Sequence, residues 1–179
     1  MELTEKTIDS REVFKGRIIR VRFDTVRLPN GKEGTREVVE HPGGVAILAI
    51  DSEDRVLLVR QYRYPYAETT LEIPAGKMDR GPENAEEAGR RELSEETGYQ
   101  ADKYTYLTKL ATTVGFSNEF IYIYAAEGLT PGEQHPDEDE FINVCTLTME
   151  EAMEKIRSGE ICDAKSITAV LLWREMQKK

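Results

Sequence analysis

Three glutamates at helical spacing carry the strongest chemical signal in the sequence. They lie in RELSEETG, residues 91–98. On a helix, Glu92 and Glu96 share one face and lie about 5.4 Å apart along the axis, with Glu95 beside them. Such like charges repel each other, and a bound divalent cation would remove that repulsion. Carboxylate oxygens suit Mg²⁺, with Mn²⁺ as the alternative, and waters and substrate phosphates would complete the coordination shell.

A solvated acidic helix face is the competing interpretation of the same residues. Glutamate is a good helix former, and glutamate-rich helices are common on protein surfaces. Taken alone, residues 91–96 favour the solvated face. The choice therefore depends on the residues that precede and follow them.

The surrounding sequence predicts a helix with clear ends. Asn84 can accept hydrogen bonds from the first backbone N–H groups, and Glu87 completes a capping box three residues later. Gly98 supplies the C-terminal stop. Runs rich in β-formers predict the strands of a small β extension at residues 18–28 and 35–41. Further such runs predict the strands of a mixed sheet at residues 45–50, 55–64, 71–76, 105–114, 119–129 and 141–148.

Two further helices follow the last of these strands. They are predicted at residues 149–159 and from Asp163 to Gln177. The second has an apolar stripe that includes Ile167, Val170, Leu171 and Trp173. The sequence therefore predicts an α/β domain, residues 42–179, preceded by a small β extension, residues 1–41.

The composition argues against several functional classes. Twenty-four basic and 34 acidic residues give a net charge of −10, which would repel a nucleic-acid backbone. No apolar run approaches the ~20 residues of a membrane span, and the N-terminus lacks the apolar core of a secretory signal. Two histidines are too few for a histidine-rich zinc site. Cys145 and Cys162 lack CxxC spacing, so reduced thiols in a cytoplasmic protein are expected.

The order of residues 76–99 resembles the Nudix box, G-x5-E-x7-R-E-U-x-E-E-x-G-U, where U is a bulky apolar residue. Glu83, seven intervening residues and RELSEETGY match its latter part, with Tyr99 in the last apolar place. Six residues rather than five separate Gly76 from Glu83. This insertion lengthens the loop before the helix and leaves the helical glutamates in phase. The resemblance therefore favours the metal site over the solvated helix face.

The resemblance implies a Nudix fold, an α+β sandwich with a mixed β-sheet between helices. It also implies metal-dependent hydrolysis of the pyrophosphate bond in a small nucleoside diphosphate compound. Glu92 and Glu96 would be metal ligands, and Glu95 a third ligand with a catalytic role. Arg91 would hold the glutamates in place by ion pairing, and the Ala75 carbonyl would be a backbone metal ligand.

Outside the box, the chain resembles the ADP-ribose pyrophosphatase branch of the family. The resembling elements are LPNGKEGTREVVEHPGGVAILAI, VRQYRYP, LEIPAGK, GFSNE, DEDEF and DAKSITAV. This branch implies cleavage of ADP-ribose to AMP and ribose 5-phosphate. It also implies a homodimer in which the N-terminal β segment exchanges between subunits and helps to form the partner's substrate site.

Arginines in two of these elements match residues that contact substrate phosphates or ribose in relatives. They are Arg36 and Arg63, and the match fits the bidentate pairing of guanidinium with phosphate. Arg60, in the same element as Arg63, is a further candidate. Glu72, in LEIPAG, either lines the pocket or pairs with an arginine.

A loop glutamate in relatives of this branch orients or deprotonates the attacking water. The DEDEF match assigns this role to Glu138, with Glu140 as the runner-up. Glu119, in GFSNE, is a third candidate. A solvated acidic turn is the alternative interpretation of the loop.

The substrate has alternatives within the same reaction class. Val114 stands where relatives directed to ADP-ribose typically carry a proline, which would fix the loop. GDP-mannose, other nucleotide sugars and dinucleotides therefore remain as alternatives. A non-catalytic ADP-ribose sensor would have eroded glutamates, and an RNA-directed enzyme would have a basic groove. Tyr62, Tyr64, Tyr66 and Phe116 either stack on the nucleobase or, as is commoner for aromatic residues on strands, belong to the core.

Overall fold

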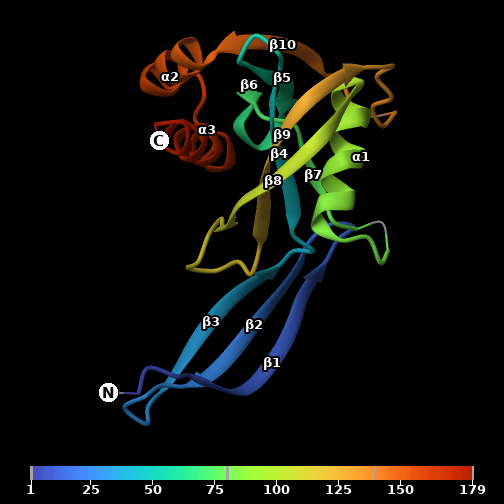
Figure 1. Ribbon diagram of the computed structural model, residues 1–179. Coiled ribbons are helices and arrows are strands. Elements are labelled where there is room, and N and C mark those ends of the chain that lie inside the picture. Colours follow the sequence, from blue (N-terminus) through green and yellow to red (C-terminus); the bar gives the residue numbers. More distant parts are fainter. Residues whose placement is uncertain (1, 80, 139, 179) are drawn as a thin grey trace. The chain divides into compact units, whose positions relative to one another are not determined.

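The computed structural model describes residues 2–79, 81–138 and 140–178, which divide into two compact units (Figure 1). The first unit contains the chain up to Gly43 together with Ala111–Phe120. The second contains Gly44–Leu110 and the chain from Ile121 onward. The GFSNE element therefore belongs to the unit of the N-terminal strands, whereas the glutamate helix belongs to the other.

The first unit is built on a three-stranded antiparallel sheet. Its strands β1, β2 and β3 lie in that order and span Lys6–Lys15, Arg20–Arg27 and Glu33–Glu40. The Val39 N–H donates to the Phe116 carbonyl at 2.7 Å, which attaches the Ala111–Phe120 segment to β3. All ten residues of β1 are exposed. The antiparallel N-terminal extension is confirmed, but β1 lacks the buried alternation that identifies a strand in a sequence.

The second unit contains a mixed sheet with the central order β10-β5-β4-β9-β8. Strand β6 pairs with β5, and β7 pairs with β4. Strands β4 and β9 are parallel, whereas β4 and β5 are antiparallel, so the predicted mixed sheet is confirmed. The strands β4 to β10 span Gly44–Ile50, Arg55–Arg63, Glu68–Glu72, Ala75–Lys77, Tyr99–Ala111, Phe120–Pro131 and Asn143–Thr148.

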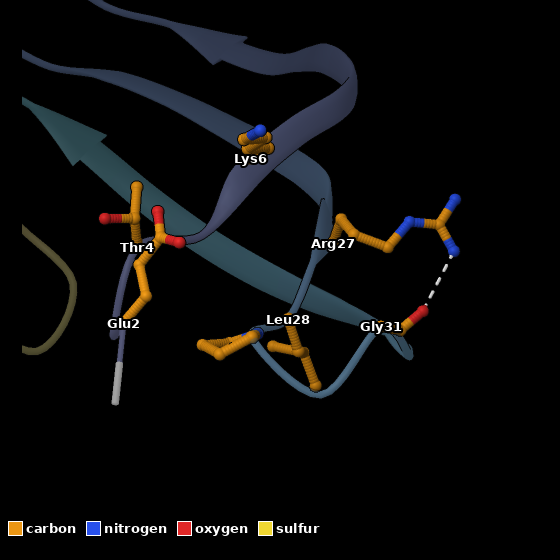
Figure 2. A pocket seen from close by; sticks show the side chains of 7 residues that line it. Glu2, Thr4, Lys6, Arg27, Leu28 and Gly31 are labelled. Carbon is orange, nitrogen blue, oxygen red and sulfur yellow. Dashed lines mark hydrogen bonds between the residues drawn. The ribbon is translucent and has the colours of Figure 1, made fainter.

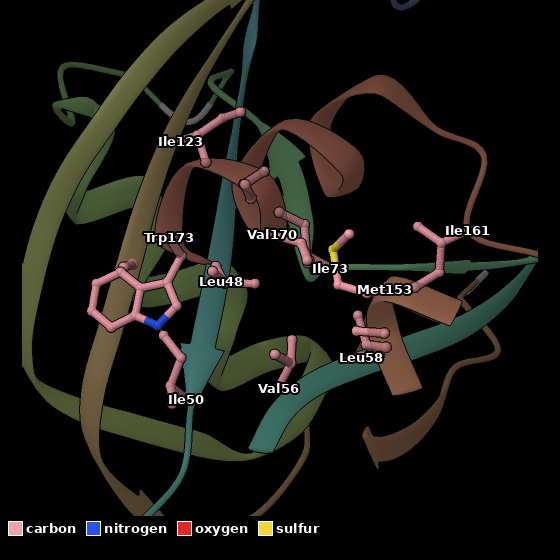
Figure 3. Packing of buried hydrophobic residues seen from close by; sticks show 14 of the residues in the cluster. Leu48, Ile50, Val56, Leu58, Ile73, Ile123, Met153, Ile161, Val170 and Trp173 are labelled. Carbon is pink, nitrogen blue, oxygen red and sulfur yellow. The ribbon is translucent and has the colours of Figure 1, made fainter. Parts of the chain in front are cut away.

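Helices cover both faces of this sheet. They are α1 (Ala85–Thr97), α2 (Met149–Ser158) and α3 (Ala164–Met176). Successive residues of a strand point to opposite faces, and every residue of β4 is buried. One face packs against α1 in a cluster that includes Val45, Ile47, Ala49, Ala88 and Leu93. The other packs against α2 and α3 in the cluster of Figure 3, which includes Leu48, Ile50, Met153, Val170 and Trp173. The sandwich is therefore confirmed.

The expected place of Leu171 in the buried stripe is wrong, and one of the two alternatives for the tyrosines is excluded. Leu171 is 43% exposed, because the apolar stripe of α3 that meets the sheet runs through Val170 and Trp173 instead. Tyr62, Tyr64 and Tyr66 are also exposed rather than in the core. The last two lie in a 3-10 turn, Tyr64–Tyr66, that ends β5, so the period-2 alternation of a strand no longer applies to them. None of the described helices is both long and apolar enough to cross a membrane.

Candidate metal and substrate site

The glutamates lie on α1, whose ends agree with the prediction. The Asn84 side chain accepts from the backbone N–H groups of Glu86 and Glu87, and the Glu87 side chain accepts from the Asn84 N–H. Gly98 ends the helix with a φ of 75°. A Cβ on Gly89 would lie 2.5 Å from the Ile47 side chain. The absence of that Cβ lets α1 approach β4 closely, which fixes the depth of the helix against the sheet.

Two of the glutamates converge on the peptide that joins Ala75 to Gly76. The Glu96 carboxylate accepts from the Ala75 N–H at 3.0 Å. The Glu92 carboxylate fills the space beside Gly76, because a Cβ there would lie 1.9 Å from its carboxyl carbon and 2.1 Å from both oxygens. The structure therefore brings Ala75, Glu92 and Glu96 together, as the sequence predicted.

Arg91 links Glu92 and Glu95 on the helix with Glu83, which precedes it. Its Nη1 donates to Glu92 at 2.6 Å and to Glu95 at 2.9 Å. Its Nη2 donates to Glu83 at 2.8 Å and to the Lys77 carbonyl at 3.4 Å. Burial alone would lower the pKa of Arg91, but the hydrogen bonds to Glu83 and Glu92 raise it. The guanidinium therefore stays charged and partly neutralises the three carboxylates that it contacts.

Burial shapes the ionisation of the two innermost glutamates. It raises the pKa of the Glu96 carboxyl to about 8, with a further rise from the charges of Glu92 and Glu140. Burial also raises the pKa of Glu92, against the opposing effect of Arg91. A buried carboxylate strongly favours any cation that can replace its lost hydration. These two groups are therefore poised to exchange a proton for a metal ion.

The donor set fits a hard divalent cation. Carboxylate oxygens on the face of α1 lie against the backbone of β7, and oxygen donors are the ligands that Mg²⁺ and Mn²⁺ prefer. Within the described ranges, no three His, Cys, Asp or Glu side chains already form a metal cage. Arg91 contacts Glu92 and Glu95 in this arrangement. Metal binding would thus require these carboxylates to share their oxygens between Arg91 and the ion.

A second charged cluster lies at β5, β6 and the start of α3. Arg63 donates to both oxygens of Glu72, each at 2.8 Å. The Lys165 ammonium contacts Glu72 and donates to Asp163 at 2.8 Å. Glu72 therefore pairs with Arg63, which was one of the two alternatives that the sequence left open for it. Lys165 was not singled out by the sequence, because a lysine at the start of a helix gives no sign of a partner 93 residues away.

Arg63 also interacts electrostatically with Glu96 on α1. Hydrogen bonding to Glu72 raises the pKa of the Arg63 guanidinium, and the charges of Glu72 and Glu96 raise it further. Arg63 in turn lowers the pKa of Glu96, although burial of that carboxyl has the larger, opposite effect. The two clusters are thus electrostatically coupled within the second unit. Arg60, by contrast, forms an ion pair with Glu160 at 2.7 Å.

The acidic loop is attached to the C-terminal turn of α1. The Gln134 side chain donates to the Glu96 carbonyl at 2.6 Å, and the His135 N–H donates to the Glu95 carbonyl at 2.9 Å. Further along, Glu138 is exposed and Glu140 is half-buried. Burial is the main cause of the raised pKa of Glu92 and Glu96. The negative charge of Glu140 adds a smaller contribution to both. Glu140, the runner-up, is therefore within electrostatic range of the α1 glutamates, and the roles of both Glu138 and Glu140 stay predictions.

Two candidates lie in the first unit. Arg36 on β3 donates to Glu5 at 2.9 Å. Glu119 accepts from the Thr112 hydroxyl at 2.7 Å. Their roles toward substrate stay predictions.

A hollow of about 250 Å³ also lies in the first unit (Figure 2). Its lining residues are Glu2, Thr4, Lys6, Arg27, Leu28, Pro29 and Gly31. Arg27 donates to the Gly31 carbonyl at 3.2 Å and pairs with Glu33. The charge of Arg27 is therefore paired with groups of the neighbouring turn and strand. The residues that line the hollow include none of the predicted site residues.

Two family models match the chain. A model of the NUDIX domain matches residues 40–169, and a model of the nucleoside diphosphate sugar hydrolase N-terminal domain matches residues 5–39. The chain is 44% identical to an ADP-ribose pyrophosphatase of Bacillus subtilis, over 94% of this chain and 91% of the relative. It is 43% identical to a methanol dehydrogenase activator of Bacillus methanolicus, over 93% of this chain and 90% of the relative.

A solved structure agrees with the sequence comparisons. The crystal structure of an ADP compounds hydrolase superimposes with a TM-score of 0.88 at 26% identity, covering 99% of this chain and 97% of the other. The NUDIX model covers well over half of the residues, and the relatives match almost their whole length. Together with the glutamates gathered on α1, these matches show that the chain belongs to the Nudix family.

Proposed function

We propose that the protein hydrolyses the pyrophosphate bond of ADP-ribose to AMP and ribose 5-phosphate, using Mg²⁺ or alternatively Mn²⁺. The observation that carries this proposal is the convergence of Glu92 and Glu96 on the Ala75–Gly76 peptide. It occurs in a chain that matches 91% of the length of a protein named ADP-ribose pyrophosphatase. Intact glutamates favour a hydrolase over a ligand sensor.

The reaction adds water across the P–O–P linkage. The water oxygen bonds to one phosphorus, the bridging oxygen leaves with the other phosphate, and a proton passes to a base. A divalent ion held by Glu92, Glu95, Glu96 and the Ala75 carbonyl would polarise the phosphate oxygens and acidify the attacking water. Arg91 keeps the carboxylates in place through its four acceptors. Arg63, clamped by Glu72, presents a fixed cation to substrate phosphate.

The test is release of AMP from ADP-ribose, ADP-glucose, NADH and diadenosine polyphosphates, and of GMP from GDP-mannose, with and without Mg²⁺. Metal-dependent turnover of ADP-ribose above the others is expected. Preferred turnover of another compound would discard the substrate while keeping the reaction. Binding of ADP-ribose without any turnover would favour the sensor.

We further propose that residues 1–41 mediate a homodimer by exchange of the N-terminal strands, in a reduced cytoplasmic compartment. Apolar side chains of β1 support the first point, since Ile8, Val13 and Phe14 are each about half exposed in the single chain. Such a surface commonly marks a protein interface. The free thiols of Cys145 and Cys162 are consistent with the second point. Sedimentation equilibrium would detect a dimer directly.

Glu140→Gln is expected to lower kcat by about 100-fold, the typical contribution of a positioned general base. Glutamine keeps the shape of the side chain but cannot accept the proton of water. Metal binding, followed by calorimetry, should persist, because the α1 carboxylates are unchanged. Glu138→Gln is the matched comparison in the same loop and should change kcat by less than about threefold. The reverse ranking of the two variants would return the role of base to Glu138.

A further inference from the structure

Lys165 occupies a position that local rules disfavour for a lysine. It lies in the first turn of α3, two residues after the Asp163 cap. Cations are unfavourable near the positive N-terminal end of a helix. Lys165 is also only 8% exposed, and lysine is seldom buried unless it is paired. Lys165 therefore breaks one local rule and requires a partner for its burial, and such local conflicts are typical of functional positions.

The compensation for this cost is Glu72. Glu72 is only 3% exposed, and its carboxylate accepts four hydrogen bonds: two from Arg63 at 2.8 Å, one from the Thr70 hydroxyl at 2.5 Å, and one from the Lys165 ammonium. Burial alone would raise the pKa of Glu72, but the hydrogen bonds and charges of Arg63 and Lys165 hold it at about 2. Glu72 is thus a permanent anion shared by two cations.

The sharing matters for Arg63. Glu72 and Asp163 together balance the charges of Arg63 and Lys165, and Glu72 receives Lys165 on one oxygen while it holds Arg63 through both. The Lys165 contact therefore fixes the carboxylate that sets the orientation of Arg63. The Arg63 side chain is 37% exposed, and its field extends to Glu96 on α1. A pre-oriented cation binds an anionic ligand more tightly, because less freedom is lost on binding.

We propose that Lys165 is a positioning residue for substrate: it holds Glu72 in the position from which that carboxylate orients Arg63 toward the substrate pyrophosphate. Asp163 holds the Lys165 ammonium from the other side at 2.8 Å. The network therefore runs from the α3 cap through Lys165 and Glu72 to Arg63. This inference rests on the proposed function only in its choice of ligand.

The test compares Lys165→Met, which removes the charge, with Lys165→Gln, which keeps a donor, and Lys165→Arg, which keeps the charge. Met and Gln are expected to raise KM for ADP-ribose by about 10- to 100-fold, the size typical for a residue behind a ligand-binding group. The kcat should change much less, and Lys165→Arg should recover most of the loss. A purely structural defect would instead lower the folded, active fraction and leave KM unchanged. Lys103→Met, at an exposed lysine of β8, is the matched control for net charge.

The decisive measurement repeats Lys165→Met in the background of Arg63→Ala. If Lys165 acts through Arg63, KM should not rise further, since no guanidinium remains to be oriented. An equal rise in both backgrounds, or an unchanged KM in the single variant, would overturn the inference. Calorimetric binding of ADP-ribose provides the same comparison without turnover, which separates failure of this inference from failure of the proposed reaction. Lys165→Gln takes the place of Lys165→Met should the latter fail to fold.

Discussion

Glu96→Gln is expected to lower kcat for metal-dependent hydrolysis by about 1000-fold, equivalent to about 4 kcal/mol of transition-state stabilisation. The substitution removes one of the two buried carboxylates beside the Ala75–Gly76 peptide and leaves the shape of the side chain unchanged. Its amide oxygen can still accept the Ala75 N–H, so the fold should be preserved. Steady-state turnover measures the loss of kcat, and calorimetric titration with Mg²⁺ measures the accompanying loss of metal binding.

Glu86→Gln is the matched control on the same helix. The Glu86 side chain is 44% exposed and pairs with Arg90 at 2.8 Å, on the side of α1 that carries no predicted ligand. Its activity should stay within about twofold of the wild type, as surface substitutions usually do. Near-normal turnover of Glu96→Gln would refute the proposed metal site.

The pH dependence of the metal-free protein gives an independent view of Glu96. Its pKa is about 8 in the folded chain against an ordinary value of 4.5. The folded state therefore holds the proton more tightly, so the associated stability is present below pH 4.5 and is lost as the pH rises toward 8. With chelator present, Tm of the wild type should fall more steeply than that of Glu96→Gln between pH 5 and pH 8. Equal slopes would show that Glu96 is not buried as described.

Local signals explain what could be predicted from the sequence. The cap at Asn84, the stop at Gly98 and the spacing of Glu92 and Glu96 depend only on residues within one helix. Each of them is found in the structure. The mixed sheet was also predictable, because β4 is an unbroken apolar run that requires cover on both faces.

Long-range pairing explains what could not be predicted. The contact of Lys165 with Glu72 joins residues 93 apart, and neither residue type reveals such a partner. The exposure of Tyr64 and Tyr66 follows from a 3-10 turn around Pro65, which a β-rich composition conceals. The attachment of the acidic loop to α1, through the hydrogen bond of Gln134 to the Glu96 carbonyl, also joins residues far apart in the sequence, and the choice between Glu138 and Glu140 as base stays a prediction.

The structure shows why the first residue of the Nudix box, Gly76, is a glycine. Gly76 has no left-handed φ, so conformational freedom is not what requires a glycine there. The requirement is space, since the Glu92 carboxylate lies where a Cβ would be. The glycine that begins the box therefore makes room for the carboxylate of Glu92 on the helix. The spacing of the two residues in the sequence does not reveal this contact.

Gly76→Ala is accordingly expected to lower Mg²⁺ affinity and kcat/KM by about 10- to 100-fold, the range typical when a metal ligand loses its support. The new methyl group would lie 1.9 Å from the Glu92 carboxyl carbon and must push this carboxylate away from the Ala75 backbone. The fold should be little affected, because the displaced group is the end of a flexible side chain and alanine is acceptable in a strand. Gly34→Ala is the matched control, a strand glycine whose added Cβ would meet only the Leu28 side chain at 3.2 Å. Calorimetry with Mg²⁺ and thermal melts of both variants separate the two effects, and unchanged Mg²⁺ affinity in Gly76→Ala would show that Glu92 binds metal from another position.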